Sequence, residues 1–271
     1  KAEFKNSAPA PLRAFAFNTR REIFKDIRVR EALHRVFDFE WLNKNLFQNA
    51  YARSESIFPR SPLADSKYRA PRSDGSGYNR DNARLAQSLL SQAGWTLQDG
   101  KLQNAAGKIF KFEILLNNPA DEKIALAYQR SLKRLGITAT IRTIDAAQFA
   151  GRLEQFDFDM TAVQWASTLS PGSEQNVYWG SKAADLRGSR NYPGIHDAEI
   201  DQFIMQLNNA SRQDDFTAAA RALDARMMSG QYFIPLYHAP RDWAAYWPSR
   251  IVPPNNPSLY GTVLETWWAK P

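Results

Sequence analysis

The stretch that decides the fold is Ile109–Asp145, IFKFEILLNNPADEKIALAYQRSLKRLGITATIRTID. In IFKFEILLN, apolar residues stand at alternate positions, which is typical of a β-strand. Apolar residues then recur at three- and four-residue spacing up to Leu135, and Gly136 follows, so this pattern predicts a helix over 121–135. The run ITATIRTID predicts a second strand. Two strands joined in this way lie parallel with a right-handed crossover, and the stretch therefore predicts an α/β fold.

The following sequence extends this unit. A short helix is expected at 146–154, and FDMTAVQW, which ends in Trp165, predicts a third strand. The carboxyl ends of parallel strands are where α/β folds place their ligands. We expect an irregular segment over 166–194, then two helices at 197–210 and 214–229, and finally a strand in YFIPLYH. A long irregular segment at such an edge is often functional, so Trp165 marks a candidate site.

The segment FNTRREIFKDIRVREALHRVFDFEWLNKNLF, 17–47, mixes many charges with many aromatic residues. Asp26 has the position of a helix N-cap. After it, Val29, Leu33, Val36 and Phe37 share one face at helical spacing. Three basic residues lie off this stripe, and we predict that they are structural residues at the protein surface: Arg28, Arg30 and Arg35.

Composition and motifs exclude several classes of protein. The chain has 271 residues and a net charge of +7, but its charges are interspersed, so no nucleic-acid partner is expected. It has no Cys, its three His are isolated, and it contains neither GxSxG nor a P-loop, so we expect no metal, no cofactor and no enzymatic activity. No apolar run reaches the roughly 18 residues of a membrane span. Trp243, Trp247 and Trp268 are predicted to fill a core.

A set of motifs then points to a family. FNTRREIFKDIRVREALHRVFDFEWLN, AGW, RSLKRLGI, LDARMM, YFIPLYH and ETWWA follow one another along the chain. Together they resemble the family 5 extracellular solute-binding proteins of ABC transporters. FDFEWLNKNLF and GYNRDN are most similar to the YejA-type peptide-binding branch. The resemblance runs from Phe15 to Trp268 and implies a two-lobed periplasmic-binding-protein fold of type II, with a mixed sheet flanked by helices, of which this chain forms mainly one lobe.

The resemblance also implies a division of the chain. Residues 1–19 would be a linker and hinge strand, and residues 20–230 the second, ligand-binding lobe. Residues 231–271 would return across the hinge and complete the first lobe, whose remainder would lie on a separate or missing N-terminal part. The hinge itself would include Phe17, Asn18 and Arg20.

The function that the resemblance implies is a periplasmic receptor of an ABC importer. Such a receptor binds oligopeptides in extended form between its lobes and delivers them to permease subunits at the inner membrane. The peptide-docking residues would be Gln164, Trp165, Ala166, Ser167 and Thr168, with Glu174 and Asn191 in the segment that follows. In relatives an Asp three positions after the Trp holds the peptide amine. Here that position is Thr168, which cannot form the ion pair, and Glu174 is the alternative partner.

Other functions stay open at this point. The same fold serves receptors for other ligands, such as a peptide antibiotic, an antimicrobial peptide or haem. A peptide-binding or chaperone-like module outside transport would also use an exposed aromatic loop. The identity of a bound molecule that co-purifies with the protein separates these possibilities.

Overall fold

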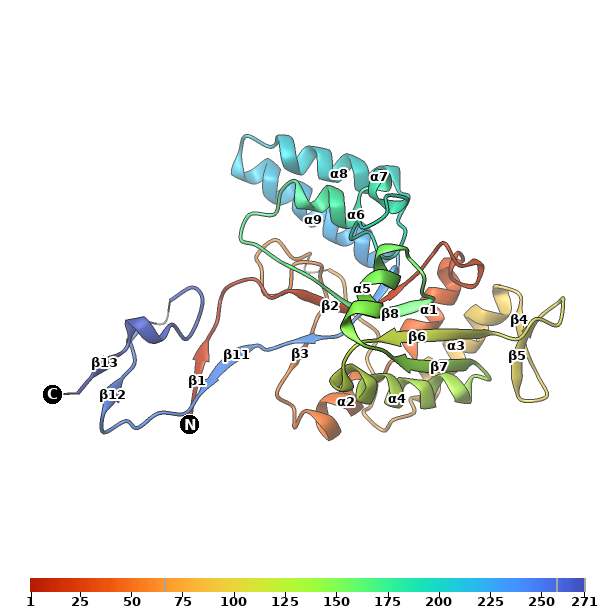
Figure 1. Ribbon diagram of the computed structural model, residues 1–271, viewed down its shortest axis with the longest axis horizontal. Helices are drawn as coiled ribbons and strands as arrows, with labels where there is room; N and C mark the ends of the chain where they lie inside the picture. The colour runs from red at the N-terminus through yellow and green to blue at the C-terminus, as the bar shows by residue number, and fades with distance from the viewer. Residues whose placement is uncertain (66, 257, 271) are drawn as a thin grey trace.

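The computed structural model describes residues 1–65, 67–256 and 258–270 (Figure 1). Its centre is a five-stranded mixed sheet in the order β7-β6-β8-β2-β9. β6 pairs in parallel with β7 and with β8, while β2 is antiparallel to β8 and to β9. α4, Pro119–Arg134, makes the crossover between β6 and β7, as predicted. The strand bounds are Leu12–Phe17 for β2, Lys111–Leu116 for β6, Thr138–Thr143 for β7, Met160–Trp165 for β8 and Phe233–Pro235 for β9.

Helices cover both faces of this sheet, and each face has its own apolar core. One core packs Phe15, Phe17 and Ile114 against α1–α4, and the other packs Ala14, Ala16 and Trp165 against α6, α8 and α9. The alternation of residues 14 to 17 between the two cores follows from the period of two along a strand. The remaining helix bounds are Ile27–Arg35 for α1, Phe39–Leu46 for α2, Arg80–Gln92 for α3, Ala146–Glu154 for α5, Glu174–Trp179 for α6, Ser181–Ala184 for α7, Ala198–Asn209 for α8 and Gln213–Ser229 for α9. The segment 166–194, expected to be irregular, thus contains the short helices α6 and α7.

α1 confirms one part of its prediction and corrects another. The Asp26 side chain accepts a hydrogen bond from the Arg28 backbone N–H at 2.8 Å, so Asp26 is the N-cap. Arg30, predicted at the surface, is only 5% exposed. Its guanidinium donates to four backbone carbonyls, those of Phe24, Lys25, Gly230 and Gln231. Arg30 is therefore an interior residue. The face of α1 that carries it packs against the carboxyl ends of the 3-10 turn at 22–24 and of the helix at 213–229.

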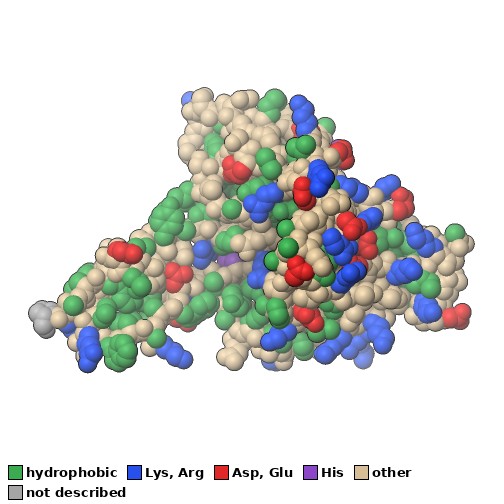
Figure 2. All heavy atoms as spheres, viewed as in Figure 1, with side chains coloured by type: hydrophobic (Ala, Val, Ile, Leu, Met, Phe, Trp, Pro, Cys, Tyr) green, Lys and Arg blue, Asp and Glu red, His purple; other side chains and the backbone are tan. Residues whose placement is uncertain are grey.

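A narrow extension projects from the lobe and carries both termini (Figure 1). β1, Ala2–Lys5, pairs with β11, Arg241–Ala244, and β12, Ile251–Val252, pairs with β13, Trp268–Ala269. Trp243, Trp247 and Trp268 lie here and are 49%, 71% and 51% exposed, so their prediction as core residues is wrong for this chain. Figure 2 shows a concentration of hydrophobic side chains over the extension. The short segment contains too few layers to bury its own aromatic rings.

Small elements complete the fold. β4, Trp95–Gln98, and β5, Lys101–Asn104, form a hairpin, and β3, Ala52–Arg53, pairs with β10, Tyr237–His238. Two 3-10 turns span Glu22–Phe24 and Leu264–Thr266. Within the described ranges, the helices lack the combination of length and hydrophobicity that a membrane span requires. β2, from the segment 1–19, and β9, from the segment 231–271, are both strands of the central sheet. The lobe therefore includes part of each of these two segments, which were expected to lie outside it.

Candidate functional site

A groove of about 330 Å³ lies where the extension leaves the lobe. We call it the junction groove. It contains Gln164, which the sequence predicts as a ligand-binding residue, and it brings together segments from both ends of the chain. Its lining residues are Asn6, Ala10, Pro11, Arg13, Tyr51, Arg60, Gln164, Tyr237, His238, Ala239 and Asp242.

Strand pairing places the predicted site beside a basic residue. β2 and β8 run antiparallel with Arg13 directly opposite Gln164. The Arg13 guanidinium forms an ion pair with the buried Asp121 in the first turn of α4 and lies 5.7 Å from the centre of the Tyr237 ring. Arg13 therefore spans the wall of the groove, and its partly exposed side chain places a cation next to the end of β8.

The end of β8 has one unpaired edge. β2 pairs with β8 along its full length to Trp165, but β6 pairs only with Met160 and Thr161. Among the described strands, none continues the ladder beside 162–165 on the β6 side, although the Gln164 carbonyl accepts a hydrogen bond from the Arg190 side chain. Backbone N–H and C=O groups that lack a strand partner at such an edge can receive an added strand.

Trp165, the last residue of β8, is buried in the core next to this edge. It is 1% exposed, and its ring lies 4.7 Å from that of Trp179 and 5.8 Å from that of Phe233. The Trp165 Nε1–H donates to the Arg190 carbonyl at 2.9 Å, and the Arg190 guanidinium donates to the Gln164 carbonyl at 2.7 Å. Trp165 is thus a packing residue, while Arg190 bonds the backbone just before it.

The three residues after Trp165 leave the core. Ala166 and Thr168 are exposed, and Ser167 is half-buried. The Ser167 Oγ is itself a buried atom without a hydrogen-bond partner in the described part of the chain. A buried hydroxyl of this kind normally finds a partner, so it marks a place where a ligand group or a water would bond.

Glu174 and Asn191 have local partners. The Glu174 carboxylate accepts two hydrogen bonds from the Gly172 backbone N–H, at 2.9 and 3.1 Å. Asn191 is fully buried. Its amide donates to the carbonyls of Gly180 and Ile195 and accepts from the backbone N–H groups of Gly194 and Ile195. The structure thus places Asn191 inside the lobe, where it holds the segment that follows α7.

The residues predicted to form the hinge lie at the opposite end of β2 from the extension. Phe17 is buried against Phe24 at 5.2 Å between ring centres. Asn18 donates to the carbonyls of Phe156 and Phe158, and Arg20 donates to backbone carbonyls between residues 184 and 192. These contacts tie the end of β2 to the lobe interior.

Arg60 instead joins the two segments that leave the lobe. Its Nε donates to the Ala8 carbonyl at 3.0 Å, and its Nη1 donates to the Ala239 carbonyl at 2.8 Å. Arg60 has a φ of +61°, which is uncommon outside glycine and indicates that the surrounding contacts hold it in place. Burial, together with the charge of Arg60, lowers the pKa of His238 to about 4, so this imidazole in the groove is neutral near pH 7.

The groove combines two tyrosine rings in tilted contact with hydrogen-bonding groups. Tyr51 and Tyr237 lie 4.6 Å apart between ring centres. The Asp242 carboxylate accepts from Asn6 at 3.0 Å and from the Thr262 backbone N–H at 2.8 Å. Within the described ranges, no group of His, Asp and Glu side chains is arranged to hold a metal ion. The groove is suited to holding an extended polar chain.

Sequence reasoning found the end of β8 but missed Arg13, Arg60 and Arg190. One signal for Arg13 was available, because it is the only charged residue in the otherwise apolar strand LRAFAF. Arg60 and Arg190 lie in loops, and no local pattern indicates which backbone they bond.

Comparison with known proteins now identifies the family. The sequence profile of the bacterial extracellular solute-binding proteins, family 5, matches residues 1–186 through its middle region. The chain belongs to this family. It is 45% identical over 294 residues to a putative binding protein of Brucella suis, covering 99% of the chain and 48% of that protein.

Two other relatives of family 5 carry more specific names. The peptidoglycan-binding protein YepA of Agrobacterium fabrum is 38% identical over 294 residues, covering 99% of the chain and 48% of that protein. The probable peptide-binding protein YejA of the same organism is 36% identical over 284 residues, covering 95% of the chain and 46% of that protein. The YejA-type resemblance is confirmed. The chain spans about half the length of the curated relatives it matches.

A solved structure agrees on the fold. The oligopeptide-binding protein AppA of Bacillus subtilis, solved with a nonapeptide, matches with a TM-score of 0.74 at 22% identity. The match covers 97% of this chain and 51% of AppA. At this identity the likeness shows the fold alone, and it confirms the predicted two-lobe class of periplasmic binding proteins.

Proposed function

We propose that this chain is the ligand-binding lobe of a periplasmic receptor for an ABC importer, and that the receptor binds oligopeptides in extended form. Membership of family 5 and the name of the YejA relative support a peptide ligand. The observation that carries the proposal is the unpaired edge of β8 beside the junction groove. A peptide laid along this edge would continue the sheet, with alternate side chains pointing into the groove.

The proposed docking residues are Gln164, Ala166, Ser167 and Thr168, with Trp165 as the buried support. Ala166 and Thr168 are exposed, and Ser167 brings its unpartnered hydroxyl. Arg13 is paired with Asp121 and the Asp242 carboxylate also lines the groove, so Arg60 is the cation that a peptide carboxylate would meet there. The peptide amine would then be held elsewhere, by Glu174 after release of its local contact or by the second lobe.

The proposed partner is the other lobe of the same receptor, followed by the permease subunits that take up the ligand. The half-length coverage of the relatives supports a second lobe outside this chain. We propose that the two lobes bend at 6–11 and 239–241, because both segments leave the lobe there and Arg60 bonds each of them. Phe17, Asn18 and Arg20 would then hold the lobe rigid behind the hinge.

A proline substitution tests the backbone role directly. In the full-length receptor, Ala166→Pro removes a backbone N–H and fixes φ, so it should abolish peptide binding measured by calorimetry. Ala166→Ser keeps the N–H and is the matched control, with binding close to that of the wild type. Equal binding by both variants would show that the peptide does not dock on this edge.

A second candidate ligand comes from one comparison. The name of the YepA relative favours a fragment of peptidoglycan, which combines a peptide with sugar rings. Mass spectrometry of the molecule that co-purifies with the full-length receptor distinguishes the two candidates, since only a peptidoglycan fragment contains amino sugars.

A further inference from the structure

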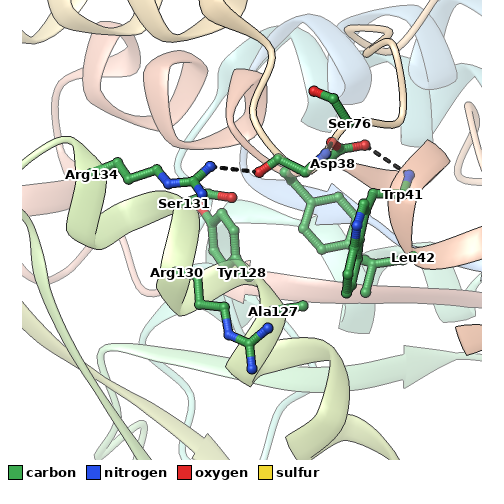
Figure 3. A pocket seen from close by; sticks show the side chains of 11 residues that line it. Asp38, Trp41, Leu42, Ser76, Ala127, Tyr128, Arg130, Ser131 and Arg134 are labelled. Carbon is green, nitrogen blue, oxygen red and sulfur yellow. Dashed lines mark hydrogen bonds between the residues drawn. The ribbon is translucent and has the colours of Figure 1, made fainter. Parts of the chain in front are cut away.

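A second cavity lies on the side of the central sheet that α1–α4 cover, between α2, α4 and the loop 73–78 (Figure 3). Its volume is about 140 Å³, and it shares no lining residue with the junction groove. We call it the α2–α4 cavity. Its lining residues are Phe37, Asp38, Trp41, Leu42, Ser76, Gly77, Ala127, Tyr128, Arg130, Ser131 and Arg134.

The interior of this cavity is apolar and aromatic. Phe37, Leu42 and Tyr128 are buried, and the rings of Phe37 and Tyr128 meet edge to face at 5.5 Å. The Tyr128 hydroxyl is already used, because it donates to the Leu33 carbonyl at 2.8 Å. In Figure 3, Trp41 from α2 and Tyr128 from α4 stand on opposite sides of the space. A cavity of about 150 Å³ with apolar walls is large enough for one benzene ring.

The loop that closes the cavity is held firmly. The Asp38 carboxylate accepts from the backbone N–H groups of Gly77 at 3.0 Å and Trp41 at 2.8 Å, and from the Ser73 hydroxyl. Gly77 has a φ of +81°, and a Cβ there would lie 3.2 Å from the Trp41 indole. The cavity wall is therefore fixed by bonds and by a close approach of backbone to ring.

The charge at the mouth is positive. Asp38 is occupied by its three donors, and Arg134 is held by a bond of 2.9 Å from its Nη1 to the Gly77 carbonyl. Arg130 is exposed and, within the ranges that the structure describes, forms no hydrogen bond or ion pair. Its guanidinium is thus available to an anion at the mouth, where two arginines outnumber one carboxylate.

We propose that the α2–α4 cavity is a second ligand site, which takes a small molecule made of one aromatic ring and a carboxylate. The ring lies between Trp41 and Tyr128, and the carboxylate meets the Arg130 guanidinium. The size of the cavity limits the ligand to one ring, and the excess positive charge selects an anion over a neutral or cationic ring of the same shape.

Three probes with the same ring test this site. Benzoate, benzyl alcohol and benzylamine are titrated into the full-length receptor and followed by ligand-observed saturation-transfer NMR. Benzoate should bind most tightly and benzylamine least. Arg130→Gln should weaken benzoate about tenfold, as expected for loss of a charge-assisted hydrogen bond, and leave benzyl alcohol unchanged. Lys123→Gln is the matched control, because it removes the same charge from α4 at an exposed position outside the cavity.

A filling variant tests the location. Ala127→Leu occupies the cavity and should abolish benzoate binding while circular dichroism and peptide binding stay as in the wild type. Persistent benzoate binding in this variant would overturn the proposal, as would equal effects of Arg130→Gln and Lys123→Gln or tighter binding of benzylamine. Saturating peptide should leave benzoate affinity unchanged, and displacement of benzoate by peptide would place the probe in the junction groove instead.

Discussion

Arg30 provides the sharpest test of how this lobe is held together. It enters the interior without a carboxylate partner in hydrogen-bond reach among the described residues, and its charge is balanced by carbonyl dipoles. Gly230 ends α9, and Phe24 and Lys25 end a 3-10 turn, so these carbonyls lack helical partners. Burial lowers the pKa of Arg30 from its ordinary value, but a guanidinium in a protein stays charged at neutral pH.

Replacement of Arg30 by Ala should therefore be costly. It leaves four carbonyls without this donor, those of Phe24 and Gly230 buried and those of Lys25 and Gln231 partly buried. Each unsatisfied buried group costs about 1–3 kcal/mol, and the partly buried ones cost less because water reaches them. With two buried and two partly buried carbonyls affected, we expect a loss of about 3–5 kcal/mol in the free energy of unfolding. Arg28→Ala, two positions away on the same helix, should change the free energy of unfolding far less, because the Arg28 side chain is exposed and its ion pair with Asp26 is screened by solvent.

Urea denaturation of the two variants, followed by circular dichroism, measures this difference. Arg30→Met is a second comparison, since it keeps most of the side-chain volume but none of the donors, and it should resemble Arg30→Ala. If Arg30→Ala and Arg28→Ala lie within about 1 kcal/mol of each other, the account of Arg30 as a buried donor to two helix ends is wrong.

Three further expectations follow from burial and bonding. Trp165→Ala should cost about 3–5 kcal/mol in thermal or urea unfolding, whereas Trp247→Ala should change stability by no more than about 0.5 kcal/mol; similar costs would contradict the assignment of Trp165 as the buried support. Burial raises the pKa of Asp224 to about 6 from 3.8, with a smaller contribution from Asp65. The folded state thus binds a proton on Asp224 more tightly than the unfolded state does. Protonated Asp224 stabilises the folded protein fully below about pH 4, and this contribution of up to about 3 kcal/mol to the free energy of unfolding is lost as the pH rises through 6. Urea unfolding across this range should show that decline in the wild type relative to Asp224→Asn, and parallel curves would refute it. In the full-length receptor without ligand, Arg60→Met should increase the radius of gyration measured by small-angle scattering, because both segments leaving the lobe lose a bond; an unchanged radius would argue against the proposed hinge.

The fold could be predicted from the sequence where its signals are local. The strand–helix–strand unit at 109–145 depends on alternation, helical spacing and Gly136, all of which are visible in one short window. Arg30 shows where this reasoning fails. Helical periodicity places it off the apolar stripe, but that face of α1 meets Gly230, 200 positions away along the chain. No period within α1 reports on such a contact.

The candidate site was predictable to a similar degree. A strand that ends in Trp165 can be read from sequence, and the structure places Gln164, just before its end, in the wall of the junction groove. The junction groove itself requires Asn6 and Asp242 to meet, and these residues are 236 positions apart. Arg60 also depends on distant partners, because its role comes from the two carbonyls that it bonds and not from its neighbours in sequence. The sequence therefore indicated the end of β8, but not the residues from distant segments that complete the junction groove beside it.

The length of the unpaired edge sets a limit on what this chain can bind alone. Positions 162–165 offer a peptide a few backbone hydrogen bonds, each worth about 0.5–1.5 kcal/mol net. Their sum of roughly 2–4 kcal/mol corresponds to dissociation constants in the millimolar range or weaker. Under the proposed function, micromolar affinity would require further contacts from the other lobe. We expect calorimetric titration of peptide into the isolated chain to show no micromolar binding, whereas the full-length receptor binds the same peptide. Micromolar binding by the chain alone, with analytical ultracentrifugation showing a monomer, would mean that one lobe holds the complete site.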